Sequence, residues 1–266
     1  MIKGKLFGTF TLCMALLVSA IAIPNRAAAS RVTPMIVEME PTGRNSIARI
    51  ELTNDADRDI AYEVQMMSGE ISPGGELTLT PADDQFVVFP PQAIVEGRSQ
   101  QVFRVQYVGE DALEQSKIFY LSIKQIPVAF QPGQNQVQVV VNFNVLINVV
   151  PDGAQPLATI RSAQYVEREI SLEGVAEEDR PEVTPIEKGI AIDLGNDGTR
   201  YFFAGRSNWS ITAKTTAGDD FAMQLSGIEM SRVIGTGVVA PGKNRLFFIP
   251  TDAALNNETL SITVDP

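Results

Sequence analysis

The chain has 266 residues with a single cysteine, no histidine and a net charge of −11 at pH 7. The absence of histidine excludes Ser-His and Cys-His nucleophilic catalysis within this chain, together with ordinary zinc sites. Only carboxylates, lysines and hydroxyls remain for an enzyme, and we expect no metal and no cofactor. The acidic balance argues against a nucleic-acid partner, because phosphates require a basic surface.

Residues 1–29 have the form of a secretory signal peptide. A positively charged start precedes an apolar stretch from about Leu6 to Ile23, and Ala27 to Ala29 supply the small residues of a cleavage site. Cleavage would remove Cys13, three bases and no acid, which takes the net charge from −11 to −14 and leaves no cysteine for a disulfide. No later apolar run is long enough to cross a bilayer, so we expect no stable membrane insertion.

Residues 30–151 are expected to form a first β-domain. Apolar and polar residues alternate over 48–53 and 103–107, which places one face of each segment on a core and the other in water. Turn signals rich in Gly and Pro, such as those at 72–75 and 131–133, separate these runs. Many short strands with this punctuation indicate β-sandwiches or barrels rather than βαβ units.

The segment from Asn54 to Asp59 has acidic residues at alternate positions, like the start of a calcium-binding loop. Ile60 stands where such a loop requires glycine, and no acid occupies the closing position. We therefore interpret the segment as a solvated turn between strands.

The most informative segment runs from Asn135 to Pro151. No charge, Gly or Pro interrupts it, and its two-residue alternation lasts well beyond a typical strand. One interpretation is a long central strand with one side in the core. The other is an edge strand offered to a partner, since proteins normally blunt long apolar edges. Periodicity does not distinguish the two. The residues on the apolar face are Val137, Val139, Val141, Phe143, Val145, Ile147 and Val149.

We place a second β-domain at residues 152–266, beginning within a Pro-Asp-Gly turn. Residues 190–194 alternate and lead to Asn196-Asp197-Gly198, where Asp-Gly suits a tight hairpin turn. The acidic stretch from Glu177 to Lys188 has no clear period, so we predict a solvated loop or mobile hairpin tip. Trp209 is interpreted as a packing residue rather than a binding platform.

Five segments carry a combined signature: SIARIELTN (46–54), FVVFPPQAIVEGRSQQVFRV (86–105), FYLSIKQIPV (119–128), the alternating segment 137–151, and PGKNRLF (241–247). Together they resemble the periplasmic chaperones of the chaperone–usher pathway. The first four are similar to the family's second strand and following asparagine, its proline-proline hallmark, its aromatic-rich strand ending in Ile-Pro, and its donor strand with a hinge proline. The last looks like the family's Pro-Gly-x-x-Arg turn.

The resemblance implies an all-β fold of two immunoglobulin-like β-sandwich domains at an angle, with a cleft between them. It also implies a non-enzymatic periplasmic chaperone that binds, folds and caps pilus or fimbrial subunits by donating a β-strand, and delivers them to an outer-membrane usher. Val137, Val139 and Val141 occupy the donated positions, and Phe143 and Val145 extend the row. Self-association that caps the donor edge is one way for the free protein to manage it.

The resemblance fails at the grip on the subunit's C-terminal carboxylate. The family uses an arginine on the first strand and a lysine near the end of the donor strand, at positions that fall near Met35 and Leu146 here, where there is no base. Arg104 and Lys124 are candidate substitutes, because a basic pair in strands of the first domain would hold a carboxylate by charge-assisted hydrogen bonds. The alternative is that both are surface residues of their strands.

Two other function classes stay open from the sequence. An exported structural or adhesive β-sandwich protein, such as a pilus component, would polymerise, whereas a chaperone stays soluble and binds its subunit one to one. A glycosidase requires two carboxyl groups about 5 or 9 Å apart. The single tryptophan provides little of the aromatic platform that a sugar cleft uses.

Overall fold

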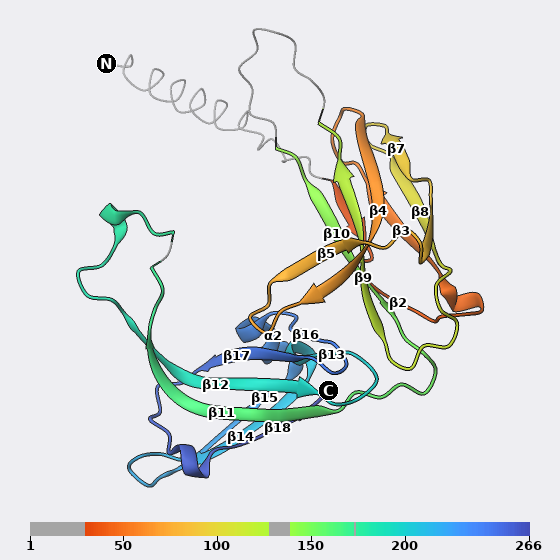
Figure 1. Ribbon diagram of the computed structural model, residues 1–266. Helices are drawn as coiled ribbons and strands as arrows, with labels where there is room; N and C mark the ends of the chain where they lie inside the picture. The colour runs from red at the N-terminus through yellow and green to blue at the C-terminus, as the bar shows by residue number, and fades with distance from the viewer. Residues whose placement is uncertain (1–29, 128–138, 173) are drawn as a thin grey trace, which may run out of the picture.

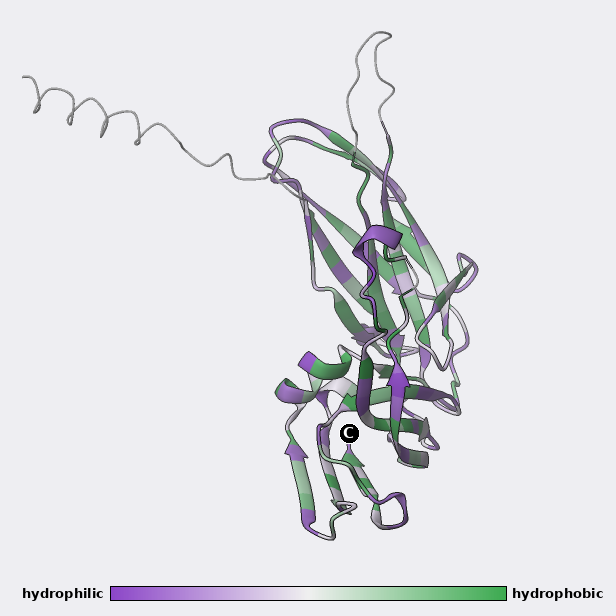
Figure 2. Cartoon of the chain, turned by 90° about the vertical axis from the view of Figure 1, so that its left-hand side faces the viewer, coloured by the Kyte–Doolittle hydropathy of each residue, from purple (hydrophilic) through white to green (hydrophobic). Residues whose placement is uncertain are grey.

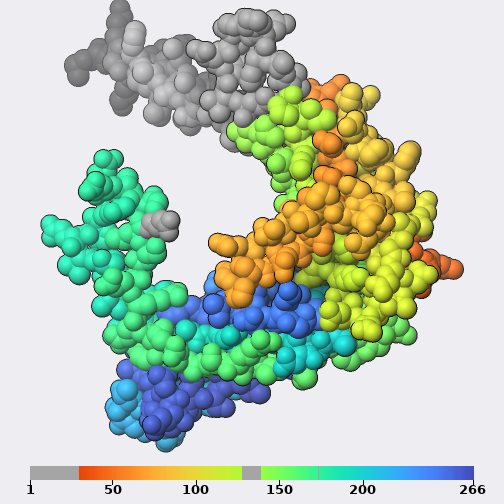
Figure 3. Space-filling model, viewed as in Figure 1, coloured from red at the N-terminus to blue at the C-terminus, as the bar shows by residue number. Residues whose placement is uncertain are grey.

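The computed structural model describes residues 30–127, 139–172 and 174–266, so the predicted signal segment lies outside the described residues. The described residues fold into two β-sandwich units set at an angle, with a hollow on the inner side between them (Figures 1 and 3). The all-β fold class predicted from the sequence is confirmed. Helix α2 (Gly227–Ile234) lies in the second unit, and no described helix has the length and apolar character of a membrane span.

The first unit packs two sheets face to face. One has the strand order β1-β3-β8-β6, and the other has the order β2-β10-β9-β4-β5, with β7 also paired to β4. Apolar and polar residues alternate along these strands (Figure 2), so Ile50 and Phe103 from the first sheet meet Leu121 and Ile147 from the second in a buried core. The elements are β1 (Arg31–Thr33), β2 (Ile36–Met39), η1 (Arg44–Ser46), β3 (Ile47–Thr53), β4 (Ile60–Ile71), β5 (Leu77–Pro81), β6 (Phe86–Phe89), β7 (Gln92–Val95), β8 (Gln100–Tyr107), β9 (Lys117–Gln125) and β10 (Asn142–Val149).

The second unit contains the sheets β11-β12-β17 and β15-β14-β18, together with the pair β13-β16. Trp209 is fully buried, its indole nitrogen donates a hydrogen bond of 2.8 Å to the Ala204 carbonyl, and its ring meets Phe247 edge-on. Its interpretation as a packing residue is confirmed. The elements besides α2 are β11 (Ala158–Glu169), η2 (Glu177–Asp179), β12 (Ile186–Asn196), β13 (Phe202–Phe203), η3 (Ala204–Arg206), β14 (Asn208–Lys214), β15 (Asp220–Leu225), β16 (Val238–Val239), β17 (Asn244–Pro250), η4 (Asn257–Thr259) and β18 (Ser261–Asp265).

Strand β12 begins earlier than expected. Of the two alternatives predicted for 177–188, a loop or a hairpin tip, the segment is the tip of the β11–β12 hairpin, and its last three residues already continue the antiparallel ladder with β11. The sequence gives no strand period here because this end of the hairpin has no buried face. It is paired through its backbone and through side-chain contacts such as Lys188 Nζ to Glu167 Oε1, at 2.9 Å.

In each unit, a buried asparagine at the end of a strand stabilises the loops beside it. Asn54 follows β3 and Asn196 ends β12, and each side chain makes four hydrogen bonds to backbone groups of the adjoining loops. The amide nitrogen of Asn54 donates to the carbonyls of Arg58, Val95 and Glu96, and its oxygen accepts from Ala56. The amide nitrogen of Asn196 donates to the carbonyls of Arg200 and Val239, and its oxygen accepts from Leu157 and Gly198.

The hydrogen bonds of Asn196 correct one expectation. A tight hairpin at residues 196–198 is wrong, because the strands beside β12 in its sheet are β11 and β17, and the chain leaves that sheet after Asn196. The side chain of Asn196, rather than a paired return strand, closes the turn through the Gly198 N–H.

The two units meet across a small apolar cluster. Tyr120 and Leu146 from the first unit pack with Tyr201 and Val238 from the second. The Ser116 hydroxyl accepts a hydrogen bond of 2.8 Å from the Tyr201 backbone N–H. The domain boundary predicted at residue 151 lies in the connection between β10 and β11, close to this cluster.

We expect Asn54→Ala and Asn196→Ala each to lower the free energy of unfolding by about 2–4 kcal/mol, because each leaves buried backbone groups without partners. Urea denaturation of the purified protein measures this. Asn45→Ala is the matched control, since that side chain bonds Glu40 at the surface, and we expect its effect to stay within about 0.5 kcal/mol. A similarly small loss for Asn54→Ala would contradict the role of the buried asparagine.

Candidate functional site

Strand β10 has an edge that is covered along only half of its length. β9 pairs antiparallel with all of β10, from Asn142 to Val149. On the other side β2 pairs in parallel with residues 146–149 alone. Within the described part of the chain, residues 142–145 therefore have a strand neighbour on one side only. In Figure 1 this half of β10 lies at the inner side of the first unit, above the second unit.

The direction of the hydrogen bonds identifies which backbone groups face outward. The Leu146 N–H points away from β9 and donates to the Met35 carbonyl at 3.0 Å, whereas the Val141 carbonyl points to β9 and accepts from Gln125 at 3.3 Å. Backbone groups alternate sides every residue in an antiparallel strand. The N–H and C=O groups of Asn142 and Asn144 therefore point outward, like those of Leu146, and are open to a further strand.

The apolar row of the predicted donor segment divides at this edge. Val139 and Val141 precede β10 and expose 72% and 40% of their surface. Phe143 is half-buried against the core of the first unit, and Val145 is fully buried within it. Val137 lies outside the described residues.

Two expectations about this segment need correction. Among the described residues the strand, β10, begins at Asn142; Val141 keeps one backbone hydrogen bond to Gln125 of β9, and Val139 and Val140 lie before the strand. The side chain of Val145 is not available to a partner in this structure, since it fills the protein's own core.

Polar side chains cover the outward face beside the open edge. Asn142 and Asn144 are exposed, and Lys124 stands opposite Asn142 across the β9–β10 ladder. Leu146, further along the same face, is buried in the joint between the units. The family resemblance places two bases near Met35 and Leu146. Here Leu146 belongs to the apolar cluster between the units, and Met35 precedes Ile36, which packs against that cluster.

The structure does not bring Arg104 and Lys124 together. Arg104 is exposed on β8 in the first sheet, between the buried Phe103 and Val105, so it projects from the outer face of that sheet. Lys124 is exposed on β9 in the second sheet and projects from the opposite outer face. The core of the sandwich separates the two side chains, and one carboxylate cannot bind both.

The acidic segment after Asn54 is used in local contacts. The Asp57 carboxylate pairs with Arg98 at 2.6 Å, and that guanidinium lowers the pKa of Asp57. The Asp59 carboxylate accepts the Gly97 N–H at 3.1 Å. These contacts fasten the turn that follows β3.

An ionic contact that was not predicted from the sequence holds the second unit in position against the first. The carboxylate of Glu38 on β2 accepts hydrogen bonds of 2.7 and 2.8 Å from Arg200 and one of 3.0 Å from the Tyr201 hydroxyl. Burial, with the adjacent charge of Glu38, raises the pKa of Tyr201, so its hydroxyl stays a proton donor. No periodicity links residue 38 to residues 200 and 201, and only the fold brings them together.

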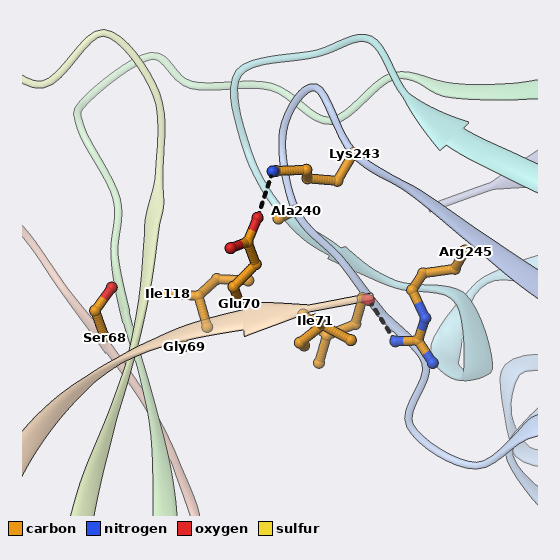
Figure 4. Close-up of a pocket in the computed structure, with 9 residues that line it drawn as sticks. Ser68, Gly69, Glu70, Ile71, Ile118, Ala240, Lys243 and Arg245 are labelled. Carbon is orange, nitrogen blue, oxygen red and sulfur yellow. Dashed lines mark hydrogen bonds and ion pairs between the residues drawn. The ribbon is translucent and has the colours of Figure 1, made fainter. Parts of the chain in front are cut away.

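A cavity of about 260 Å³ lies beside this joint, between the end of β4 and the second unit (Figure 4). Lys243 donates to Glu70 at 2.8 Å on one side of it. On the other side Arg245 donates to the Val238 carbonyl at 2.9 Å, and burial lowers the pKa of Arg245. The contact of Lys243 with Glu70 attaches the β4–β5 hairpin to the second unit, so the cavity is part of the joint.

The comparisons with known proteins agree with this architecture. Residues 32–155 match the family model described as "Pili and flagellar-assembly chaperone, PapD N-terminal domain". The solved structure "Crystal Structure of Class 5 Fimbriae Chaperone CfaA" matches with a TM-score of 0.50 and 10% identity, over 90% of this chain and 99% of that chain. A chain of "Chaperone-tip adhesin complex is vital for synergistic activation of CFA/I fimbriae biogenesis" matches with a TM-score of 0.50 and 9% identity, over the same shares. No curated protein sequence matches the chain. At these identities the structural matches establish the fold.

Proline substitutions test the open edge, because proline removes the backbone N–H. Asn144 and Ser122 face each other in the β9–β10 ladder. We expect Asn144→Pro to change the free energy of unfolding by less than about 1 kcal/mol, since its N–H has no strand partner. Ser122→Pro should cost about 3 kcal/mol or more, since β9 is paired on both sides. Equal losses in chemical denaturation would show that the edge is not open.

Proposed function

Because the N-terminal domain of this chain, residues 32–155, belongs to the pili and flagellar-assembly chaperone family, we propose that the protein binds a pilus subunit along the open edge of β10. In this role it completes and caps the fold of the subunit in the periplasm and then delivers it to an outer-membrane usher. The role is non-enzymatic and requires no cofactor.

The observation that carries the proposal is the half-covered strand β10, which has exposed valines just before it. An incoming strand would pair with the outward backbone groups of Asn142 and Asn144, which gives affinity without dependence on a particular sequence. Val139 and Val141 would enter pockets of the partner, and burying such side chains contributes about 1.5–3 kcal/mol each. Val137 is proposed to continue the row.

The buried part of the row supports the same role in a different way. Val145 and Ile147 are fully buried in the core of the first unit, and Phe143 packs against that core. They fasten the C-terminal end of the donated segment to a rigid sheet, so the segment has a defined position and direction. A fixed strand loses less conformational entropy on binding than a free loop, which favours affinity.

For the carboxylate of the subunit we propose Lys124 as a contact and assign no role to Arg104. Lys124 projects from the same face as Asn142 and Asn144, beside the open edge, whereas Arg104 projects from the outer face of the other sheet. Since no second base stands beside Lys124 in the register of β9 and β10, this contact would be a single charge-assisted hydrogen bond.

The test of the proposed function is co-expression, in the periplasm of a bacterium, with the candidate pilus subunits encoded beside the gene. We expect the native chain to yield a soluble one-to-one complex. Val139→Asp/Val141→Asp should abolish this complex and leave the subunit degraded or aggregated, because two carboxylates cannot enter apolar pockets without a large desolvation cost.

The matched control is Val87→Asp/Phe89→Asp, which charges two exposed side chains that are also two residues apart, on β6 in the other sheet. This variant should capture the subunit like the native chain. If the Val139→Asp/Val141→Asp protein also captures it normally, the donated strand is not the binding element. If the native chain polymerises with its own copies, the protein is a structural pilus component.

A second pair of variants tests the proposed anchor. Lys124→Ala should weaken subunit binding by about tenfold, which corresponds to the loss of one charge-assisted hydrogen bond. Arg104→Ala should leave binding unchanged. Each purified variant is titrated with a purified subunit whose groove is empty, at two salt concentrations. The titrations give the dissociation constant of each variant for the subunit. Equal effects of the two substitutions would reject the assignment of Lys124.

A further inference from the structure

The hairpin of β11 and β12 extends beyond the body of the second unit. β12 pairs with β17 only from Gly189 onward, where Gly189 lies opposite Pro250. The pairing of β12 with β11 continues three residues further, to Ile186 opposite Glu169. We call the projecting part, residues 167–172 and 174–188, the arm.

The base of the arm is held in register by charged contacts. Arg168 donates to Glu187 at 2.9 Å, and Lys188 donates to Glu167 at 2.9 Å, so the two strands are cross-linked on both sides. The Arg168 guanidinium also lies 3.8 Å from the centre of the Phe248 ring on β17. Each contact is exposed and individually weak, but together with the backbone ladder they give the arm a fixed direction.

Large apolar side chains are exposed along the arm. Val183 exposes 79% and Ile186 exposes 59% of its surface. Ile170 is also exposed, and its N–H donates to the Pro185 carbonyl at 2.9 Å. This pairing follows that of Glu169 with Ile186, so the side chains of Ile170 and Ile186 lie on opposite faces of the hairpin. Val183 and Ile186 are thus largely uncovered apolar side chains on a projecting element, as at a contact surface.

The arm stands across the hollow from the open edge of β10. Figures 1 and 3 show it rising on one side of the hollow, with the first unit on the other side and the body of the second unit below. In Figure 2, which views the molecule from the side of the arm, its η2 turn is hydrophilic. That turn carries Glu177, Glu178 and Asp179. A polypeptide paired with β10 would therefore lie between the donated strand and the arm.

We infer that the arm is a second contact surface for the same pilus subunit, and this inference rests on the proposed function. Val183 and Ile186 pack on an apolar patch of the subunit surface, away from the groove that the donated strand fills. The acidic turn faces a region of the subunit that carries lysine or arginine. Backbone pairing alone leaves the subunit able to rotate about the axis of β10. The contact with the arm limits this rotation.

Site-directed cross-linking tests where the subunit lies. The only cysteine, Cys13, is in the predicted signal segment, so one introduced cysteine is a unique attachment point for a benzophenone maleimide. The positions are Val183→Cys on the arm, Val139→Cys on the donated segment and Val87→Cys on the outer face of the first sheet. After illumination of the co-expressed complex, we expect the subunit to be linked to residues 139 and 183 and not to residue 87.

The outcomes separate the two proposals. Linkage at 139 without linkage at 183 overturns the role of the arm and leaves the proposed function intact. No linkage at either position overturns both. Linkage from 183 to a second copy of this chain also overturns the inference, because the arm would then be a dimer contact.

A binding measurement tests whether the contact contributes affinity. We expect Val183→Ser/Ile186→Ser to raise the dissociation constant for the subunit about tenfold while the thermal unfolding of the chain is unchanged, since both side chains are already exposed. Val87→Ser/Phe89→Ser is the matched control and should bind like the native chain. A native dissociation constant for the arm variant would overturn the inference.

Discussion

The short strand β2 determines what this protein offers to a partner. It covers only the second half of β10, so the backbone of residues 142–145 stays open on one side. A longer β2 would turn β10 into an ordinary central strand. The chain reaches β2 from β1, which pairs with β3 in the other sheet. Because the first strand region is divided between two sheets, neither part can cover the whole of β10.

The same strand, β2, also holds the second unit in position against the first. Glu38 of β2 binds Arg200 and Tyr201 across the joint, opposite Asn148 in the β2–β10 ladder. The contact that limits the open edge is therefore continuous with the contact that orients the second domain. A change at β2 would alter both the length of the open edge and the position of the arm on the far side of the hollow. In the proposed function, this connection sets the position of the arm relative to the open edge.

Much of the first unit could be predicted from the sequence. Ile50, Phe103 and Val105 alternate with polar residues, and the structure buries all three. The function of β10 could not be read in this way. An alternating segment looks the same whether one or two strands flank it, and the coverage of β10 depends on where β2 begins. Sheet membership was hidden for the same reason, so Arg104 and Lys124 appeared equivalent although they project from opposite faces. The tip of the arm was predicted as a solvated loop or hairpin tip, but its paired strands were missed because they pair through polar residues and have no buried face to give a period.

An open edge is a risk for a free protein, because two copies can pair through it. Here the risk is limited by the length of the edge and by charge. Only four residues of β10 lack a second neighbour among the described strands, and the acidic chain repels its own copies. A charge placed within the edge would prevent self-pairing more effectively, but it would also prevent pairing with a subunit, since both use the same backbone groups and apolar side chains. The sequence from Val139 to Val145 contains no charged residue, and the negative charge lies elsewhere on the surface. In the proposed function, this division leaves the strand free to pair with a subunit, and the repulsion between acidic copies opposes pairing of two copies without a charge inside the edge.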